Sequence, residues 1–164
     1  MNSNKLDVYP HNFSEKIGYT EVRHILEGYC ASTLGQEEMQ RLEASCDTIE
    51  IARALDESRE MMTILSGESV LPSLALVDCS EVLRRIRPQG TYIEEEELLD
   101  LLRMLETLHS LQHFFLEEHT TGERTTETFA YTYPRLSTLL EDTPSFPKIE
   151  SHLRSLLTEE GKLR

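Results

Sequence analysis

The residues best placed to do chemistry are two histidines, His109 and His113, which lie four positions apart. On a helix both imidazoles would share one face, with Glu117 one turn further on, and such a set can bind a metal ion. The zinc-protease pattern HExxH requires glutamate directly after the first histidine, and Ser110 stands there instead. We therefore expect structural or surface histidines, and a metal-dependent enzyme is the weakest of three hypotheses.

Nucleotide-binding and hydrolase motifs are not found in the sequence. A phosphate loop of the form GxxxxGK[ST] that ended at Gly161 and Lys162 would need glycine where Leu156 stands. No GxGxxG and no GxSxG nucleophile elbow occurs in the sequence. We predict that this chain is not an enzyme and carries no catalytic residue, no cofactor-binding residue and no metal ligand.

Paired carboxylates are frequent, for example Glu94 with Glu97 and Glu117 with Glu118. In a chain with 30 acidic residues such pairs arise by chance, so they are weak evidence for acid–base catalysis. The formal net charge of -14 also opposes approach to nucleic acid phosphates. We expect weak or no nucleic-acid binding by this chain alone.

The densest basic group consists of Arg84, Arg85 and Arg87. These arginines could meet a phosphate or an acidic partner, but in so acidic a chain we expect them to pair with nearby glutamates.

Composition points to a folded cytoplasmic protein. Hydrophobic residues make up 38% of the 164 residues, which is sufficient for a core. No apolar run approaches the roughly 20 residues that cross a bilayer. The three cysteines show no CxxC pair, which favours neither a disulfide framework nor a zinc site.

Apolar residues recur at helical spacing along most of the chain, which predicts an all-α fold, an irregular bundle of several helices. The strongest signal runs from Glu94 to Glu118, where the glutamates at 94–97 favour a helix start and Leu105 lies at the centre of a wide apolar arc. We therefore expect Leu105 in the core. Residues 1–18 read as an N-terminal arm, and residues 19–164 as one helical domain.

The other expected helices are bounded by capping residues and by turns. Thr20 is expected to cap a helix that ends near Ala31, and Ser32 a second helix that ends near Ser45. A third helix should run from 47–48 to 66–67, and a fourth should begin after Asp78 or Ser80. Two more are expected around 133–140 and from Pro147 to Gly161. Residues 70–77 are expected to form a buried loop or extended piece, and residues 119–130 an exposed loop.

Four ordered segments together resemble the start of the bacterial MutS-Two family, the Smr-bearing paralogues of the mismatch-repair protein MutS. They are Val22 to Leu26 with Cys30 to Gly35; Leu55 to Ser58 with Leu71-Pro72; Gly90 and Glu96 to Leu102 with Tyr133 to Leu136; and Glu159 to Leu163. Two departures are Leu74-Ala75 in place of the family's Gly-Gly, and Glu94-Glu95 in place of its Ser-Pro helix start.

This resemblance implies part of the helical core, or lever, domain of a MutS-like protein. The expected piece links a clamp of long helices to an ATPase domain in a longer polypeptide. The full-length family is similar to MutS in being a homodimeric ATPase that uses ATP and Mg²⁺, and it usually ends in an Smr endonuclease domain. Family members are associated with DNA recombination intermediates and with the rescue of collided ribosomes. None of the family's catalytic motifs matches a position here.

Two hypotheses about the function of this chain remain, and they belong to different classes of protein. The first is a non-catalytic connector whose partners are the remaining domains of the same polypeptide. The alternative is a free-standing helical adaptor that binds a protein through the apolar excess of the 94–118 helix.

Overall fold

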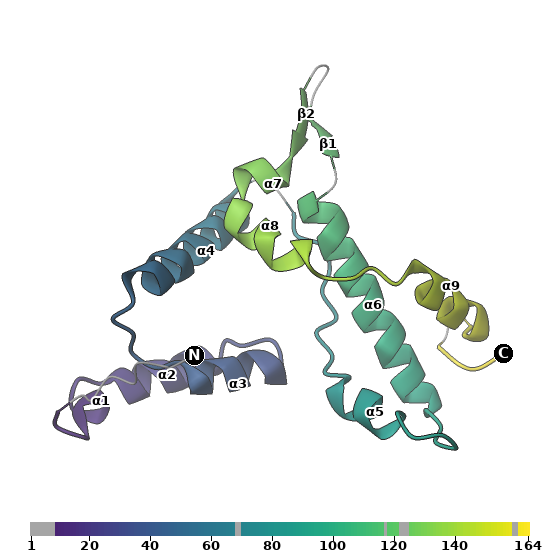
Figure 1. Cartoon of the computed structure of the whole chain (residues 1–164), viewed down its shortest axis with the longest axis horizontal. Helices are drawn as coiled ribbons and strands as arrows, with labels where there is room; N and C mark the ends of the chain where they lie inside the picture. Colours follow the sequence, from purple (N-terminus) through teal and green to yellow (C-terminus); the bar gives the residue numbers. More distant parts are fainter. Residues whose placement is uncertain (1–8, 68–69, 117, 122–124, 159–160) are drawn as a thin grey trace. The chain divides into compact units, whose positions relative to one another are not determined.

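Figure 1 shows the computed structural model, which describes residues 9–67, 70–116, 118–121, 125–158 and 161–164. Those residues form nine helices and one β-hairpin, so the predicted all-α class is confirmed. The helices are α1 Phe13–Lys16, α2 Tyr19–Glu27, α3 Thr33–Arg41, α4 Thr48–Ser66, α5 Ser80–Arg85, α6 Glu95–Leu116, α7 Phe129–Thr132, α8 Pro134–Glu141 and α9 Pro147–Leu156. Among the described residues, no helix combines the length and the apolar character that crossing a membrane requires.

The chain divides into two compact units, Met1–Ala54 and Leu55–Arg164, with the division inside α4. Part of the predicted N-terminal arm, residues 1–8, lies outside the described residues. The remainder of that arm contains the one-turn helix α1.

Two predicted helix starts in the first unit are confirmed by their capping hydrogen bonds. The Ser32 hydroxyl accepts from the Gly35 N–H at 3.1 Å and begins α3. Asp47 Oδ1 accepts from the N–H groups of Ile49 and Glu50 at 2.8 and 3.2 Å and begins α4. Short side-chain acceptors therefore mark these boundaries as the sequence indicated.

The expected bounds of the first two helices were partly wrong. Gly18, with φ 75°, precedes α2 and takes the place predicted for Thr20 as the N-cap. A glycine adopts this left-handed backbone conformation without the steric cost of a side chain. Helix α2 ends at Glu27 rather than near Ala31, and α3 ends at Arg41 rather than near Ser45.

Helix α6 is the centre of the second unit and has 22 residues, which makes it roughly 33 Å long at 1.5 Å per residue. Its first half packs on α9 in a cluster of Leu98, Leu102, Leu105, Leu153 and Leu157. Its last turn contributes Phe115 to a second cluster, with Ile64 of α4, and Tyr133 and Leu136 at the start of α8. Leu105 is buried, as predicted.

Residues 70–79 run beside α6 without regular structure before α5 begins (Figure 1). Thr107, which is buried, accepts from the Ala75 N–H at 3.0 Å. The predicted loop at 70–77 is confirmed, but its burial is only partial, because Val70 is 85% exposed. At its end Asp78 Oδ1 accepts from the Ser80 N–H at 2.8 Å, so Asp78 supplies the cap contact although Cys79 occupies the N-cap position.

Residues 118–128 contain a β-hairpin where an exposed loop was expected. Strand β1, Glu118–Thr121, pairs antiparallel with β2, Thr125–Thr128, and Glu118 lies opposite Thr128. The loop prediction was wrong because threonine has a high strand propensity, and two runs of it close together in the sequence can pair.

The last helix also ends earlier than predicted, at Leu156 instead of Gly161. Leu157 is extended and pairs with Leu163 in an antiparallel bridge. Gly161 has φ 80°, and a Cβ there would lie 2.6 Å from Leu99 Cδ2. This glycine therefore closes a turn that folds the chain end back onto α6.

Candidate functional site

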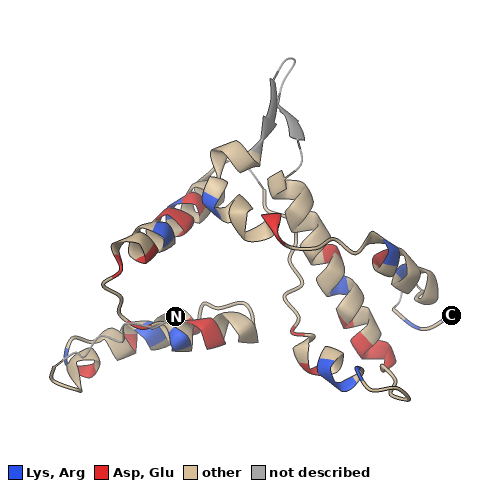
Figure 2. Ribbon diagram, in the orientation of Figure 1, with Lys and Arg blue, Asp and Glu red and all other residues tan. Residues whose placement is uncertain are grey.

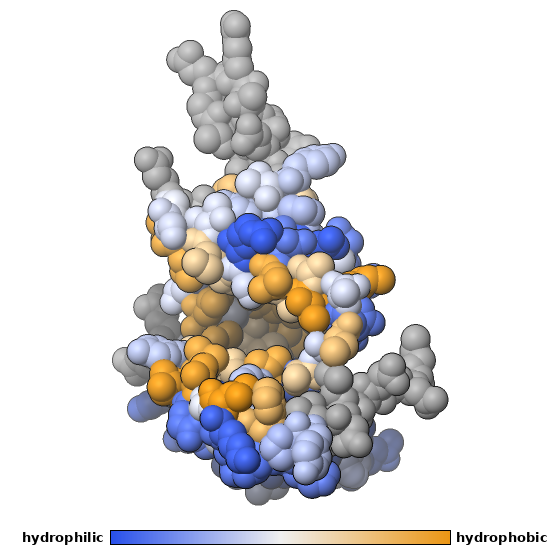
Figure 3. Space-filling view, turned by 90° about the vertical axis from the view of Figure 1, so that its left-hand side faces the viewer, coloured by the Kyte–Doolittle hydropathy of each residue, from blue (hydrophilic) through white to orange (hydrophobic). Residues whose placement is uncertain are grey.

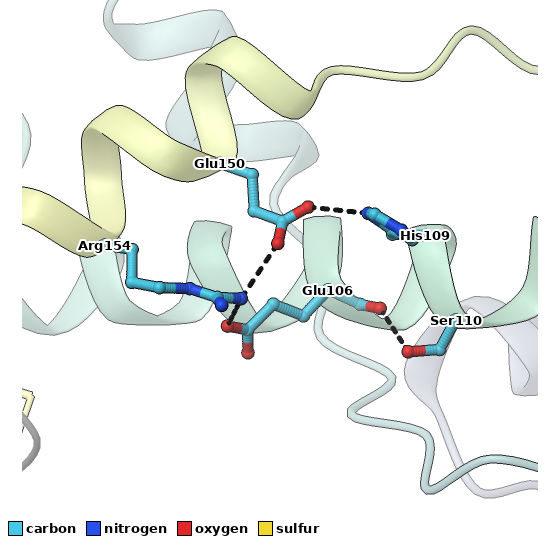
Figure 4. Close-up of polar contacts among 5 residues, drawn as sticks. All are labelled: Glu106, His109, Ser110, Glu150 and Arg154. Carbon is cyan, nitrogen blue, oxygen red and sulfur yellow. Dashed lines mark hydrogen bonds and ion pairs between the residues drawn. The ribbon is translucent and has the colours of Figure 1, made fainter. Parts of the chain in front are cut away.

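A polar network joins α6 to α9 (Figure 4). Arg154 Nη2 donates to Glu106 Oε1 at 2.6 Å and to Glu150 Oε1 at 2.8 Å. The second oxygen of Glu150 lies 3.0 Å from His109 Nδ1. Ser110 completes the group by donating to the Glu106 backbone carbonyl at 2.8 Å. One arginine thus bridges two carboxylates from two helices.

This network gives His109 a structural partner. The Glu150 side chain is only 14% exposed, whereas that of His109 is 53% exposed, so the imidazole covers the carboxylate at the edge of the helix pair. His113 is also exposed, one turn along α6. In the part of the chain that the structure describes, no three His, Cys, Asp or Glu side chains are grouped as metal ligands. Glu117, the third residue of the sequence pattern, lies outside that part, and so does the side chain of Glu118.

A second polar contact joins α5 to the start of α6, where Figure 2 shows basic residues beside acidic ones. The Arg85 guanidinium pairs with the Glu97 carboxylate and donates to the Tyr92 carbonyl at 3.2 Å. Arg84 acts electrostatically on Asp78. The expectation that this arginine group serves intramolecular pairing is confirmed for Arg85.

The Glu97 carboxylate also caps its own helix. Glu97 Oε2 accepts from the Glu94 N–H at 3.0 Å, as a glutamate at the third helical position commonly does. This backbone hydrogen bond, together with Arg85, lowers the pKa of Glu97 below its ordinary value. The Glu94 and Glu97 pair therefore forms the start of α6.

A third contact fixes α8 to α4. The two oxygens of Glu60 accept from the backbone N–H groups of Arg135 and Leu136, at 3.1 and 2.9 Å. These are first-turn donors of α8, whose first position is Pro134, and they have no partner within the helix. Glu60 is therefore an N-terminal cap supplied from another helix, and it places a negative charge at the positive end of α8.

The turn at the chain end does not fit the phosphates of ATP. A phosphate loop needs several free backbone N–H groups. Here the Gly161 N–H donates to the Thr158 carbonyl at 2.9 Å, the Lys162 N–H to the Thr158 hydroxyl at 3.2 Å and the Leu163 N–H to Glu95 Oε1 at 2.9 Å. The donors are used, and a carboxylate stands where an anion would bind. We assign no step of ATP chemistry to these residues.

The sequence did not predict the long-range contacts made by five residues: Glu60, Glu95, Thr107, Glu150 and Arg154. Each pairs with a group at least 32 positions away in the sequence. No local pattern could have identified them. Two residues singled out from the sequence have partners in the fold: His109 contacts Glu150, and Arg85 pairs with Glu97. Among the described residues, no third metal ligand lies with His109 and His113.

Known proteins similar to this chain are endonucleases called MutS2. The protein of Clostridium botulinum strain Eklund 17B is 32% identical over 100 residues, 61% of this chain and 13% of that protein. That of Alkaliphilus oremlandii is 26% identical over 145 residues, 88% of this chain and 17% of that protein. The putative endonuclease MutS2 of Bacillus subtilis is 25% identical over 140 residues, 85% of this chain and 15% of that protein.

The chain spans less than a fifth of the length of each of these relatives. No protein-family profile and no solved structure matches it significantly. The similarity nevertheless extends over most of the chain in several relatives, which is what the four ordered segments led us to expect. The resemblance is confirmed, and this chain is related to the MutS2 family.

Proposed function

We propose that this chain is a non-catalytic helical connector, corresponding to part of the core or lever domain at the N-terminal side of a MutS-like protein. The observation that carries the proposal is the set of contacts along α6. Glu95 and Glu97 bind the chain end and α5 at its start, the Glu106 and Arg154 network binds α9 at its middle, and Phe115 packs against α4 and α8 at its end.

Because of these contacts, α6 is attached to other parts of the chain at both ends and can act as a rigid link between them. The chain reaches the end of α6 through α4, whose Ile64 lies in the cluster with Phe115. After α9 it returns to the start of α6, where Glu95 Oε1 accepts from the Leu163 N–H. A displacement of either attachment would move the whole helix, because a packed helix deforms little along its axis. That is the property a mechanical link between two domains requires.

The wider role is part of the same proposal. The whole protein would be a cytoplasmic, homodimeric ATPase with an Smr endonuclease domain that acts on DNA recombination intermediates or collided ribosomes. ATP and Mg²⁺ would bind in its other domains, since the turn at Gly161 uses its N–H donors internally. The partners of this chain would be the remaining domains of the same polypeptide.

An activity assay tests the absence of catalysis. The purified chain should hydrolyse neither ATP nor DNA above the level of a mock purification. Turnover that exceeds the mock control and is abolished by a single substitution in the chain, such as His109→Ala, would overturn the proposal.

A binding assay tests whether the chain itself reaches nucleic acid. The net charge of -14 opposes phosphates, so we expect duplex DNA to bind no tighter than about 0.1 mM at roughly 150 mM salt. Fluorescence anisotropy measures this. Micromolar binding that weakens steeply with salt and is lost in Arg84→Glu would instead assign a DNA-contacting role to α5.

The free-standing adaptor is the second candidate, and the exposed apolar residues of α2 and α4 favour it. Val22 and Ile25 of α2 are 53% and 61% exposed, and Leu55 and Met62 of α4 are 58% and 67% exposed. The sequence led us to expect that the partner would bind to α6. Among the described residues, however, no large hydrophobic side chain of α6 is exposed. The genomic reading frame after Arg164 separates the two candidates, because a downstream GxxxxGK[ST] loop supports the connector and a stop codon supports the adaptor.

A further inference from the structure

His109 and His113 lie one turn apart on α6, and both side chains are exposed. Side chains four positions apart on a helix are neighbours on its surface, so a single metal ion can reach both imidazoles. The two histidines also line one groove of about 400 Å³, together with Val70, Pro72 and Phe114. The fold therefore places both rings at the same opening on the surface of this unit.

The contact with Glu150 determines which nitrogen of His109 carries a proton. Nδ1 lies 3.0 Å from Glu150 Oε2, and the other oxygen of that carboxylate accepts from Arg154. A carboxylate that pairs with an arginine is ionised and can only accept, so Nδ1 must supply the proton of this hydrogen bond. In the neutral ring the lone pair is then on Nε2, and a lone pair is what a metal ion binds.

A carboxylate behind the imidazole is the usual support of a histidine that binds a metal ion. It orients the ring and makes the ligating nitrogen more basic. Glu150 is itself held in place, because its side chain is only 14% exposed and Arg154 ties it to Glu106 of α6. The fold thus orients His109 in the way that such a ligand requires.

The serine that follows His109 is compatible with metal binding. Ser110 stands where the HExxH motif has glutamate, and that glutamate is the general base of the metalloprotease, not a metal ligand. Its replacement therefore argues against catalysis and leaves binding possible. Two histidines are also fewer than the three protein ligands of a catalytic zinc site, so water would fill the remaining coordination positions.

We propose that His109 and His113 bind a divalent late transition-metal ion, Cu²⁺, Ni²⁺ or Zn²⁺, through one ring nitrogen each, with Nε2 of His109 as the nitrogen that Glu150 supports. Imidazole suits these ions, whereas Mg²⁺ and Ca²⁺ prefer oxygen ligands. Cu²⁺ should bind most tightly, as it does at nitrogen sites in general. This inference goes beyond the connector role, does not depend on it, and revises the sequence-based expectation that the chain has no metal ligand.

Titration of the whole chain with Cu²⁺ tests the site. Cys30→Ser and Cys46→Ser are introduced first, because accessible thiols would bind the ion themselves, whereas Cys79 is buried. The tightest binding step should take up one ion per chain. The electron paramagnetic resonance spectrum of that complex should show two nitrogen ligands.

Substitutions in this background identify the ligands. Glu150→Gln, which removes the supporting charge, should weaken Cu²⁺ binding by about tenfold. His109→Gln and His113→Gln each remove a ligand and should weaken it at least as much. His152→Gln is the matched control, because His152 is exposed on α9 and has no histidine four positions away on either side. It should bind Cu²⁺ as the parent chain does, and circular dichroism checks that each variant is folded.

Carboxylates on the surface are the other place where a cation could bind. The face shown in Figure 3 carries many strongly hydrophilic residues, and 30 residues of the chain are acidic. An excess of Mg²⁺ should displace ions held by such carboxylates but should leave Cu²⁺ on the histidines. Complete displacement by Mg²⁺, or unchanged binding in His109→Gln and His113→Gln, would overturn the proposal. Unchanged binding in Glu150→Gln alone would overturn the supporting role given to Glu150.

Discussion

The two units of this chain use amphipathic helices in different ways. In residues 9–54, no side chain is buried, although α2 has a clear apolar face. In the unit from Leu55 to Arg164, two clusters of buried residues form around the two halves of α6. Helical periodicity therefore predicts a helix and the direction of its apolar face, but burial depends on whether another element covers that face.

The largest effect that tests this contrast comes from truncating leucines in the two units. Leu105→Ala should lower the free energy of unfolding by about 2 to 5 kcal/mol, because it removes a buried side chain and leaves a cavity. Leu26→Ala in α2, where the side chain is 42% exposed, should cost under about 1 kcal/mol. Urea titration followed by circular dichroism measures both. Equal losses would show that α2 is covered in solution and would remove the contrast.

A smaller effect is expected from the cap that joins α4 to α8. Glu60→Ala leaves the N–H groups of Arg135 and Leu136 without their acceptor, so the free energy of unfolding should fall by about 1 to 2 kcal/mol. Glu60→Gln keeps one acceptor oxygen and should recover part of this loss. Thermal melts of the two variants measure the difference. If Glu60→Ala were as stable as the unsubstituted chain, the contact between α4 and α8 would not be formed in solution.

The smallest predicted effect concerns pH and the start of α6. The Glu94 N–H, with help from Arg85, holds the pKa of Glu97 below its ordinary value in the folded chain. A lowered pKa stabilises the fold above the unfolded pKa and ceases to do so as the pH falls through the folded pKa. The melting temperature of the chain should therefore exceed that of Glu97→Gln near pH 7, and the gap should close below about pH 4.

The Asp78 carboxylate provides an internal comparison for this measurement. Its pKa is lowered chiefly by the Ser80 backbone N–H, so Asp78→Asn should show a gap of the same sign over a similar pH range. A gap for Glu97→Gln that stays constant from pH 7 to pH 3 would mean that its loss is steric and not electrostatic.

Local sequence determined the helices and most of their starts. Ser32 and Asp47 were predicted to begin α3 and α4 because a short side-chain acceptor satisfies N–H groups two or three residues away, which is a local event. Leu105 was predicted to be buried because it lies at the middle of an apolar arc. The hairpin at 118–128 was missed because paired strands depend on a partner that periodicity within one segment does not reveal.

The pairing of polar groups that are distant in the sequence is determined by the tertiary structure alone. Nothing near Glu60 in the sequence shows that its carboxylate caps a helix 75 residues away, and nothing near His109 shows that Glu150 is its partner. The same holds for the apolar faces, because the helical period of α6 does not show that α9, α8 and α4 enclose it. The physical reason is that the hydrogen bonds and caps of a helix join groups within a few residues of each other. Burial and ion pairing instead require the fold to bring together groups that are distant in the sequence.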